Sequence, residues 1–314
     1  MADPFGTAIV RCLARIPRGR VTTCGAIARA LGDVRAARAV AAWILDHPTR
    51  NGHRVVRGDG TPIRRDAGAR LWDDGVTLRG GRASGSRFAD PLPAVGLLAA
   101  LRAEQIRLAG QVLEADEPAP PETVAGVDAS YAGDSAFAAA AVYGIDDLDL
   151  RETATVRMPV DFPYIPTYLG YRELPPIAAA LARLSRRPDM VLIDGHGRLH
   201  PARFGVACFA GVQLGLRTIG VAKHPLAGSP RRQDRGRADA VPIDLDGQLA
   251  GFAWTPPQGT RPLYVSVGHR VSLESALDLV RRTTKERMPE PLKSADRIAR
   301  EMKGKEKRER GSER

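Results

Sequence analysis

The stretch Met190-Val-Leu-Ile-Asp-Gly-His-Gly-Arg-Leu-His-Pro201 decides the fold of the second half of the chain. Its first four residues are apolar, which is typical of a strand buried on both faces of a parallel sheet. The apolar run ends abruptly at Asp194, and open α/β sheets present their ligand-binding groups at the carboxyl ends of strands. The stretch therefore predicts an α/β domain with a functional site at this edge of its sheet.

Two further carboxylates are candidates for the same site. Asp128 lies in an expected strand, residues 124–131, where an unpaired charge is costly; the alternative is a turn or edge position. Glu173 is expected to open a helix that begins at Leu174, although the helix dipole alone favours carboxylates there. With Asp194 they form a set of hard oxygen donors suited to Mg²⁺ or Mn²⁺. Zinc is disfavoured because no histidine–cysteine cluster accompanies them.

Basic side chains follow the carboxylates. His196 and His200 could orient or deprotonate an attacking water, and the alternative for both is a hydrogen bond that supports a ligand or a loop. Lys223 ends an expected strand that begins at Thr218, and it is the first lysine of the chain. A compact ammonium at this position would stabilise charge on a phosphoryl transition state.

An aromatic loop precedes Glu173. Tyr164, Tyr168 and Tyr171 lie close together between prolines that stiffen the loop. A rigid loop of this kind is suited to insertion into a stack of bases.

Composition indicates a polyanionic partner. The 314 residues carry a formal net charge of +11, and six of the 47 basic residues are lysine, so arginine dominates. Arginine suits bidentate contacts with phosphate, although a compositional bias would also raise its count. Cys12, Cys24 and Cys208 show no pairing or metal spacing, and no apolar run is long enough to span a bilayer. We expect a cytoplasmic protein without a membrane partner.

The N-terminal part predicts a pair of helices. Thr22-Thr23 caps a short helix that ends at Gly32, and Asp33 caps a second helix, residues 34–46, which carries Arg38 among small residues. Two helices joined by a glycine turn suggest a helix-turn-helix, with Arg38 free to reach into a duplex. The segment 79–91 is rich in glycine, serine and arginine, which favours a flexible connector.

Residues 5–78, and Pro48-Thr-Arg-Asn-Gly-His-Arg-Val-Val-Arg-Gly-Asp-Gly60 in particular, resemble the DNA-binding domain of alkylguanine-DNA alkyltransferases. That family carries its alkyl-accepting cysteine in a Pro-Cys-His-Arg signature, where this chain has Asn51-Gly52-His53-Arg54. The resemblance therefore implies an alkyltransferase-like winged-helix domain that binds damaged DNA without repairing it, with Arg38 filling the stack when a base is flipped. Cys24 replaces a family tyrosine, and the alternative is a scaffold that only holds nucleic acid.

The second part resembles endonuclease V over residues 95–295. The motifs that carry the resemblance are Gly126-Val-Asp-Ala-Ser-Tyr131, Pro163-Tyr-Ile-Pro166, Tyr171-Arg-Glu173, Asp194-Gly-His-Gly197, Gly220-Val-Ala-Lys223 and Val267-Gly-His-Arg-Val-Ser272. The family implies a ribonuclease H-like fold and cleavage on the 3′ side of inosine. By the resemblance Asp128, Glu173 and Asp194 hold the metal, His200 and Lys223 assist the attack, and His269 lies near the active site. Tyr164 is the wedge, and Leu169 and Gly195 line the base pocket; Thr167 stands where many relatives have glycine.

We therefore expect a winged helix-turn-helix domain (1–85), a linker (86–93), a ribonuclease H-like α/β domain with a central mixed sheet (94–296) and a basic disordered tail (297–314). The expected function is Mg²⁺- or Mn²⁺-dependent repair of DNA that contains deoxyinosine, by a monomer. The alternatives are an endoribonuclease that cuts RNA at inosine and a noncatalytic DNA-binding regulator.

Overall fold

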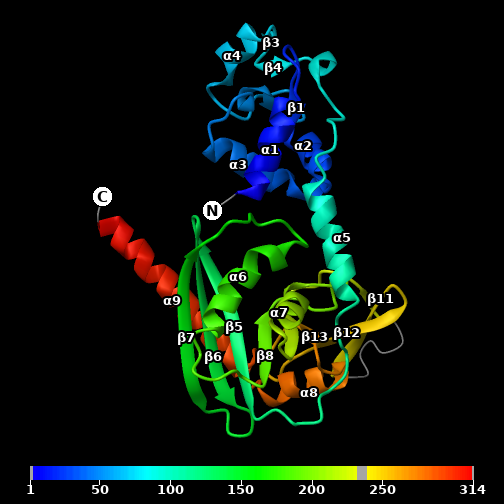
Figure 1. Cartoon of the computed structure of the whole chain (residues 1–314), viewed down its shortest axis with the longest axis vertical. Coiled ribbons are helices and arrows are strands. Elements are labelled where there is room, and N and C mark those ends of the chain that lie inside the picture. Colours follow the sequence, from blue (N-terminus) through cyan, green and yellow to red (C-terminus); the bar gives the residue numbers. More distant parts are fainter. Residues whose placement is uncertain (1–2, 232–238, 313–314) are drawn as a thin grey trace. The chain divides into compact units, whose positions relative to one another are not determined.

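The structure is a computed structural model that describes residues 3–231 and 239–312 (Figure 1). Its contacts divide the chain into two compact units: unit 1 is Met1–Glu104 with Asp161–Pro166, and unit 2 is Gln105–Val160 with Thr167–Arg314. The first boundary falls inside helix α5 (Leu97–Ala109). Within the described ranges, every helix is too short or too polar to cross a lipid bilayer.

Unit 1 contains short helices and small strand pairs. Its elements are α1 (Pro4–Ala14), β1 (Thr22–Thr23), α2 (Cys24–Leu31), η1 (Val34–Ala36), α3 (Ala37–Asp46), η2 (Gly52–Arg54), β2 (Val55–Val56), α4 (Ala67–Asp73), β3 (Leu78–Arg79), β4 (Arg82–Ala83) and η3 (Gly85–Arg87). The predicted caps of α2 are confirmed: the Thr23 hydroxyl accepts from the Ala26 amide, and Gly32 ends the helix at φ 111°. The Asp33 carboxylate accepts from the Arg35 amide and tightens the next turn into η1, so α3 begins later than predicted.

The segment predicted to be a flexible linker, residues 86–93, is instead hydrogen-bonded to unit 1. The Ala89 amide donates to the Val21 carbonyl at 2.7 Å, and the Thr22 hydroxyl donates to the Ala89 carbonyl at 2.9 Å. Immediately before it, β3 and β4 form a hairpin whose turn, Gly80-Gly81, has positive φ at both residues, as a tight two-residue turn requires. The glycines here form a tight turn. A composition typical of flexible linkers therefore does not show that this segment is flexible.

A buried ion pair joins distant parts of unit 1. The Asp74 side chain, 13% exposed, accepts from Arg54 Nε at 2.5 Å and lies 2.8 Å from His53 Nε2. The hydrogen bond from Arg54, and then that from His53, lower the pKa of Asp74 to about 2. Arg54 also donates to the Ile16 carbonyl at 2.8 Å, so the segment that contains Gly52 is fixed from two sides.

Unit 2 is built on a nine-stranded sheet with the order β10-β11-β12-β13-β9-β8-β5-β6-β7. The elements are β5 (Thr123–Ala132), β6 (Ser135–Gly144), β7 (Leu150–Pro159), α6 (Leu169–Leu181), β8 (Met190–Asp194), α7 (Val206–Leu214), β9 (Thr218–Ala222), β10 (Ser229–Pro230), β11 (Ala240–Leu245), β12 (Gln248–Trp254), β13 (Leu263–His269), α8 (Leu273–Arg282) and α9 (Glu290–Ser312). The pairs β5–β8 and β8–β9 are parallel, and the other strand pairs are antiparallel. The predicted α/β fold with a central mixed sheet is therefore confirmed.

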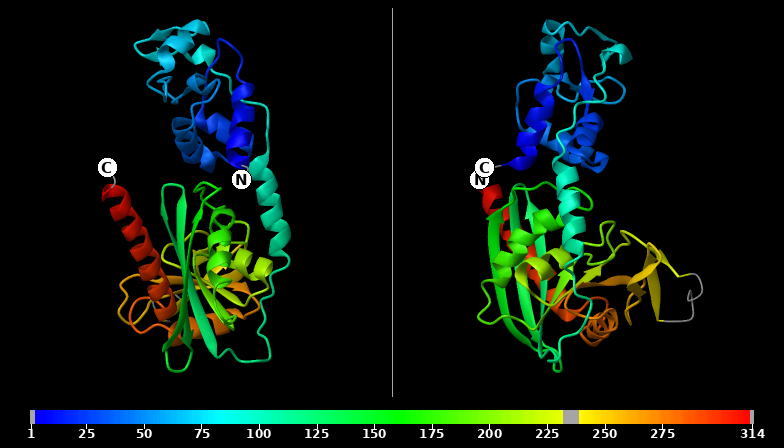
Figure 2. Two further views of the ribbon diagram at one scale, coloured as in Figure 1. Left: turned by 60° about the vertical axis from the view of Figure 1, so that its left-hand side comes forward. Right: turned by 45° about the vertical axis from the view of Figure 1, so that its right-hand side comes forward.

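Helices cover both faces of this sheet, with α6 and α7 on one face and α9 on the other (Figures 1 and 2). Successive side chains of a strand point to opposite faces. Val127 of β5 packs in one core with Ile177 of α6. Val124, an odd number of residues earlier on the same strand, packs in another core with Leu292 of α9. By the same alternation Asp128 points toward α9.

Helix α9 (Glu290–Ser312) overturns the prediction of a disordered tail over residues 297–312, and the last two residues of the predicted tail lie outside the described residues. The polar composition of this segment favoured disorder. In the structure Ala299 is fully buried, and Glu306, only 9% exposed, places its carboxylate 2.6 Å from Arg157 of β7. Packing against the sheet stabilises the helix where its own composition does not predict one.

Helix α6 also differs from its prediction, because it begins at Leu169 rather than at Leu174. Glu173 consequently lies inside the helix instead of opening it, and two prolines that normally mark a helix start follow within the helix. Tight packing stabilises the earlier turn: a Cβ added at Gly170 would lie 2.2 Å from the ring of Phe209.

Candidate active site

Strand register places Asp128 and Asp194 side by side. The parallel strands β5 and β8 pair Val127 with Ile193, so the next residue of each strand is one of the two aspartates. Lys223 directly follows the neighbouring strand β9, and its Nζ lies 2.5 Å from Asp194 Oδ2. Residues from three separate sequence motifs therefore meet at the carboxyl edge of the parallel strands, as predicted for such sheets.

Negative charge accumulates at this edge. Burial, and then the charges of Asp128 and Asp194, raise the pKa of Glu173 to about 8. Burial, the charge of Asp194 and a hydrogen bond with Asp296 raise the pKa of Asp128 to about 7. Two carboxyl groups share a hydrogen bond only when one of them is protonated. Lys223 alone therefore does not neutralise the cluster.

Asp296 belongs to this cluster although the sequence did not predict it. It lies on α9, 27% exposed, with one carboxylate oxygen 2.8 Å from Arg300 Nε. The sequence does contain a helical pattern here. Ala295 and Ala299 are spaced as the inward face of a helix, and Asp296 lies next to that face. The highly charged composition of the following residues concealed the helix and, with it, the carboxylate.

His196 lies beside the cluster as a neutral imidazole. It follows Asp194 by two residues, and burial lowers its pKa to about 4. The ring forms a hydrogen bond with the backbone of His224, next to Lys223. Its Nδ1 is buried and has no hydrogen-bond partner among the described residues. The imidazole therefore retains one nitrogen without a partner, which a water or a substrate could engage only after the surrounding side chains move.

His200 is engaged by the backbone at both ring nitrogens. The side chain is 3% exposed, its Nδ1 accepts from the Ala202 amide at 3.1 Å, and Nε2 lies 3.0 Å from the Thr167 carbonyl. Since Nδ1 accepts, the proton is on Nε2, which donates to Thr167. This geometry fixes the backbone at Thr167, which has φ 69°, and it does not present a free base.

His269 lies at the other edge of the sheet, contrary to the prediction that it is near the active site. It pairs with Thr218 at the start of β9, whereas Lys223 follows the end of that strand. The length of β9 separates the two ends by roughly 13 Å. The His269 Nδ1 accepts from the Leu113 amide at 3.2 Å, which is a structural contact. The motif is displaced because β13 runs antiparallel to β9.

The predicted substrate-binding residues occupy several places. Leu169 is the first residue of α6, and Gly195 directly follows Asp194, where a Cβ would lie 2.4 Å from Val206. Tyr164 belongs to the Asp161–Pro166 segment of unit 1 and is 63% exposed. Arg38 is exposed near the start of α3.

The donor chemistry of the carboxylate cluster fits a divalent cation. Mg²⁺ and Mn²⁺ prefer carboxylate oxygens, and such an ion would compensate the charge that raises the pKa values of Asp128 and Glu173. In residues 3–231 and 239–312, however, no three His, Cys, Asp or Glu side chains are placed so that they could hold a metal ion as they stand. Lys223 forms an ion pair with Asp194, and Asp296 shares a hydrogen bond with Asp128, so both aspartates already have partners. Asp128, Glu173 and Asp194 therefore lie at one end of the parallel strands, but their oxygens are not arranged to coordinate one ion.

Comparison with known proteins identifies unit 2. Residues 106–297 match the family described as Endonuclease V. The endonuclease V of Roseiflexus castenholzii is 44% identical over 199 residues, which are 63% of this chain and 90% of that protein. The crystal structure of endonuclease V from Streptomyces avermitilis is 38% identical, with a TM-score of 0.62, and the match covers 67% of this chain and 94% of that one.

A further solved structure holds a nucleic acid. Endonuclease V of Ciona intestinalis, in complex with a 24mer DNA that contains an inosine followed by a ribo-adenosine, is 27% identical with a TM-score of 0.62, over 66% of this chain and 98% of that one. Residues 4–74 match the family described as 6-O-methylguanine DNA methyltransferase, DNA binding domain. The chain therefore belongs to the endonuclease V family and is a DNA repair endonuclease with a second, DNA-binding domain at its N-terminus.

Proposed function

We propose that this protein cuts DNA at deoxyinosine, by hydrolysis of a phosphodiester bond on the 3′ side of the deaminated base, with Mg²⁺ or Mn²⁺ as its cofactor. The observation that carries the proposal is the meeting of Asp128, Glu173 and Asp194 with Lys223 at one strand edge. The inosine in the Ciona intestinalis complex supports the choice of base. The strand order β7-β6-β5-β8-β9 supports the ribonuclease H-like arrangement.

Each residue of the cluster has a distinct role in the proposed reaction. A divalent cation, when bound, supplies a Lewis acid and lowers the pKa of a bound water. Asp128, Glu173 and Asp194 would hold it, with Asp296 as a further carboxylate against Asp128. Lys223 donates to a non-bridging phosphate oxygen, where it stabilises the charge that develops as water attacks. Neutral His196 accepts a hydrogen bond from water or substrate through its unoccupied nitrogen.

His200 is a positioning residue in this mechanism. Its hydrogen bond to the Thr167 carbonyl holds the residue that separates the Tyr164 loop from α6. Tyr164 enters the stack left by the extruded base, because an exposed aromatic ring on a proline-stiffened loop can replace base stacking. Leu169 and Gly195 contact the extruded hypoxanthine.

A panel of labelled oligonucleotides tests the substrate. We expect Mg²⁺-dependent nicking of a duplex with one deoxyinosine, and at least ~10-fold slower nicking of matched duplexes with uracil, an abasic site or O6-methylguanine. Single-stranded DNA and RNA with one inosine, compared at the same salt concentration, distinguish DNA repair from RNA cleavage. A third substrate is a DNA strand in which one ribonucleotide follows the inosine, as in the Ciona intestinalis complex. Its cleavage rate shows whether a single 2′-hydroxyl is enough to change the preference. Faster cleavage of the RNA than of the DNA would reverse the assignment.

We further propose that unit 1 is a winged helix-turn-helix that binds damaged DNA without alkyl transfer. The proposed domain is the part of unit 1 over residues 1–85. Gly52 replaces the acceptor, and burial raises the pKa values of Cys12 and Cys24 to about 11, so neither thiol is a thiolate at neutral pH. Arg38 occupies the space left by a flipped base.

The Arg38→Ala variant tests this role. We expect its affinity for an O6-methylguanine duplex to fall about tenfold, with a smaller loss for the unmodified duplex, because the arginine replaces a stacked base. Fluorescence anisotropy of the full chain in EDTA measures binding without cleavage. Arg70→Ala on α4 removes the same charge from another exposed position and serves as the control. An equal loss of affinity for both duplexes would indicate that Arg38 contacts only phosphate and does not replace a base.

A further inference from the structure

Two adjoining cavities lie in unit 2 at the sheet edge opposite the carboxylate cluster. They have volumes of about 300 and 340 Å³ and share Glu117, Pro120 and Arg217. Met190, which begins β8, lines the first cavity, and Arg217 directly precedes β9. Asp194 and Lys223 lie at the other ends of these strands, so the length of β8 alone separates the two sites by roughly 13 Å.

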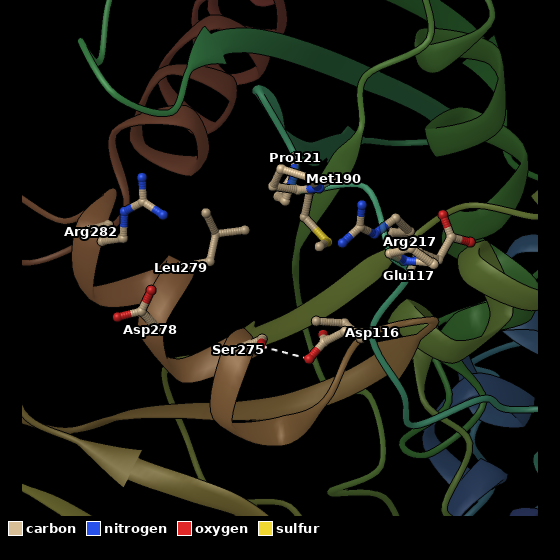
Figure 3. A pocket seen from close by; sticks show the side chains of 12 residues that line it. Asp116, Glu117, Pro121, Met190, Arg217, Ser275, Asp278, Leu279 and Arg282 are labelled. Carbon is tan, nitrogen blue, oxygen red and sulfur yellow. Dashed lines mark hydrogen bonds between the residues drawn. The ribbon is translucent and has the colours of Figure 1, made fainter.

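The first cavity has room for a flat group between apolar side chains, and the carboxylates of Asp116, Glu117 and Asp278 also line it. Met190, Val271 and Leu279 contribute apolar surface. Figure 3 shows Arg217 and Arg282 on opposite sides, with Met190 and Leu279 between them. The Asp116 carboxylate on the wall is already engaged by the Ser272 amide and the Ser275 hydroxyl (Figure 3).

The second cavity is suited to an anion. Arg187, Arg217 and Arg270 come from three separate segments and converge on it. Of the two acids in its lining, Asp189 accepts from the backbone and hydroxyl of Thr123, and Glu117 is paired with Arg270 at 2.8 Å. Arg270 already pairs with Glu117, so the guanidinium groups that favour a phosphate group here are those of Arg187 and Arg217.

Arg217 connects the two cavities and lacks one hydrogen bond. Its Nη1 donates to the Ala119 carbonyl at 3.0 Å. Its Nε is buried without a hydrogen-bond partner among the described residues. Buried donors are rarely left without an acceptor, so the Arg217 side chain is a candidate to change its hydrogen bonds when a ligand binds.

We propose that the two cavities form a binding site for a nucleoside monophosphate. The phosphate lies among Arg187, Arg217 and Arg270, and the base lies in the apolar cavity between Met190 and Leu279. Each cavity is large enough for one such group and too small for a duplex. The site is separate from the nuclease centre and does not depend on the function proposed for it.

Calorimetric titration of the full chain tests the site with adenosine 5′-monophosphate, adenosine, inorganic phosphate and a short single-stranded DNA. We expect the monophosphate to bind at least ~10-fold more tightly than adenosine or inorganic phosphate, because it alone fills both cavities. Arg187→Ala and Arg217→Ala should each weaken it about tenfold or more. The control is Arg186→Ala, which removes the neighbouring exposed charge that does not line the cavity.

Several outcomes would overturn the proposal: no binding of the monophosphate, equal binding of inorganic phosphate, binding of the oligonucleotide alone, or an equal loss in Arg186→Ala. Arg187 is exposed, so its variant remains informative if Arg217→Ala does not fold. Nicking of a deoxyinosine duplex, measured on the same preparations, should be unchanged in Arg187→Ala. A failure of nucleotide binding with normal nicking therefore rejects only this site.

Discussion

Replacement of Asp128 by asparagine should reduce nicking of a deoxyinosine duplex at least ~10³-fold, because it removes a carboxylate from the centre of the proposed cation site. The same variant should be more stable than the parent protein in EDTA at pH 8. Asparagine has nearly the shape of aspartate and carries no charge, so it relieves the repulsion from Asp194 and Glu173. A noncatalytic DNA-binding protein would retain all of its activity after this change.

The pH dependence of this stability follows from the raised pKa of Asp128. Its value of about 7 in the folded protein exceeds the ordinary 3.8, so folding takes up a proton between these values. Stability in EDTA should therefore fall as pH rises from 4 to 7, by roughly 3–4 kcal/mol, and Asp128→Asn should abolish that part of the fall.

Tryptophan fluorescence can follow this unfolding, because Trp254 is the tryptophan of unit 2 and is buried. Denaturant titrations at pH 5 and pH 8 measure the difference. Asp246→Asn makes the same chemical change at an exposed left-handed turn and should leave both stability and nicking near the parent values. Identical pH profiles for the parent protein and Asp128→Asn would contradict the argument.

Replacement of Asp74 by asparagine should destabilise unit 1 by about 3–5 kcal/mol, because it leaves the Arg54 guanidinium buried without its counter-charge. The pKa of Asp74, lowered to about 2, gives the sign of the pH effect. Its stabilising contribution is complete above the ordinary value near 4 and is lost as pH falls toward 2. Both other tryptophans, Trp43 and Trp72, belong to unit 1, so its unfolding contributes to the fluorescence of the full chain.

Asp66→Asn is the matched control for Asp74→Asn. Asp66 also pairs with an arginine, Arg64, but its side chain is 59% exposed. Exposed pairs contribute little, so we expect a change within about 0.5 kcal/mol. If Asp74→Asn unfolds at the same denaturant concentration as the control, the buried ion pair does not stabilise unit 1 as argued.

The sequence predicted those parts of the active site that depend on strand ends. Asp194 and Lys223 each follow an apolar run, and parallel strands bring such ends together by their register. The sequence did not predict Asp296, because its helix is stabilised by contacts with the sheet that composition does not reveal. It placed His269 wrongly, because the direction of β13 relative to β9 is a property of the sheet order and not of the motif.

The predicted roles of the two other histidines illustrate a similar limit. The short spacing from Asp194 predicted a place for His196 near the carboxylates, and the structure shows a buried ring bonded to the backbone of His224. The same spacing could not show that the Ala202 amide and the Thr167 carbonyl occupy both nitrogens of His200. Motifs identify which residues meet, whereas hydrogen-bond partners determine which of them have an atom left for chemistry.

Gly52 has a consequence for how many lesions one molecule can serve. A cysteine that accepts an alkyl group irreversibly can react only once. An enzyme fused to such a domain would afterwards carry an inactive domain. Gly52 offers no nucleophilic atom, so under the proposed function unit 1 would leave every encounter covalently unchanged. Both halves of the chain would then be used again after each lesion, and turnover instead of stoichiometry would limit the number of strands cut.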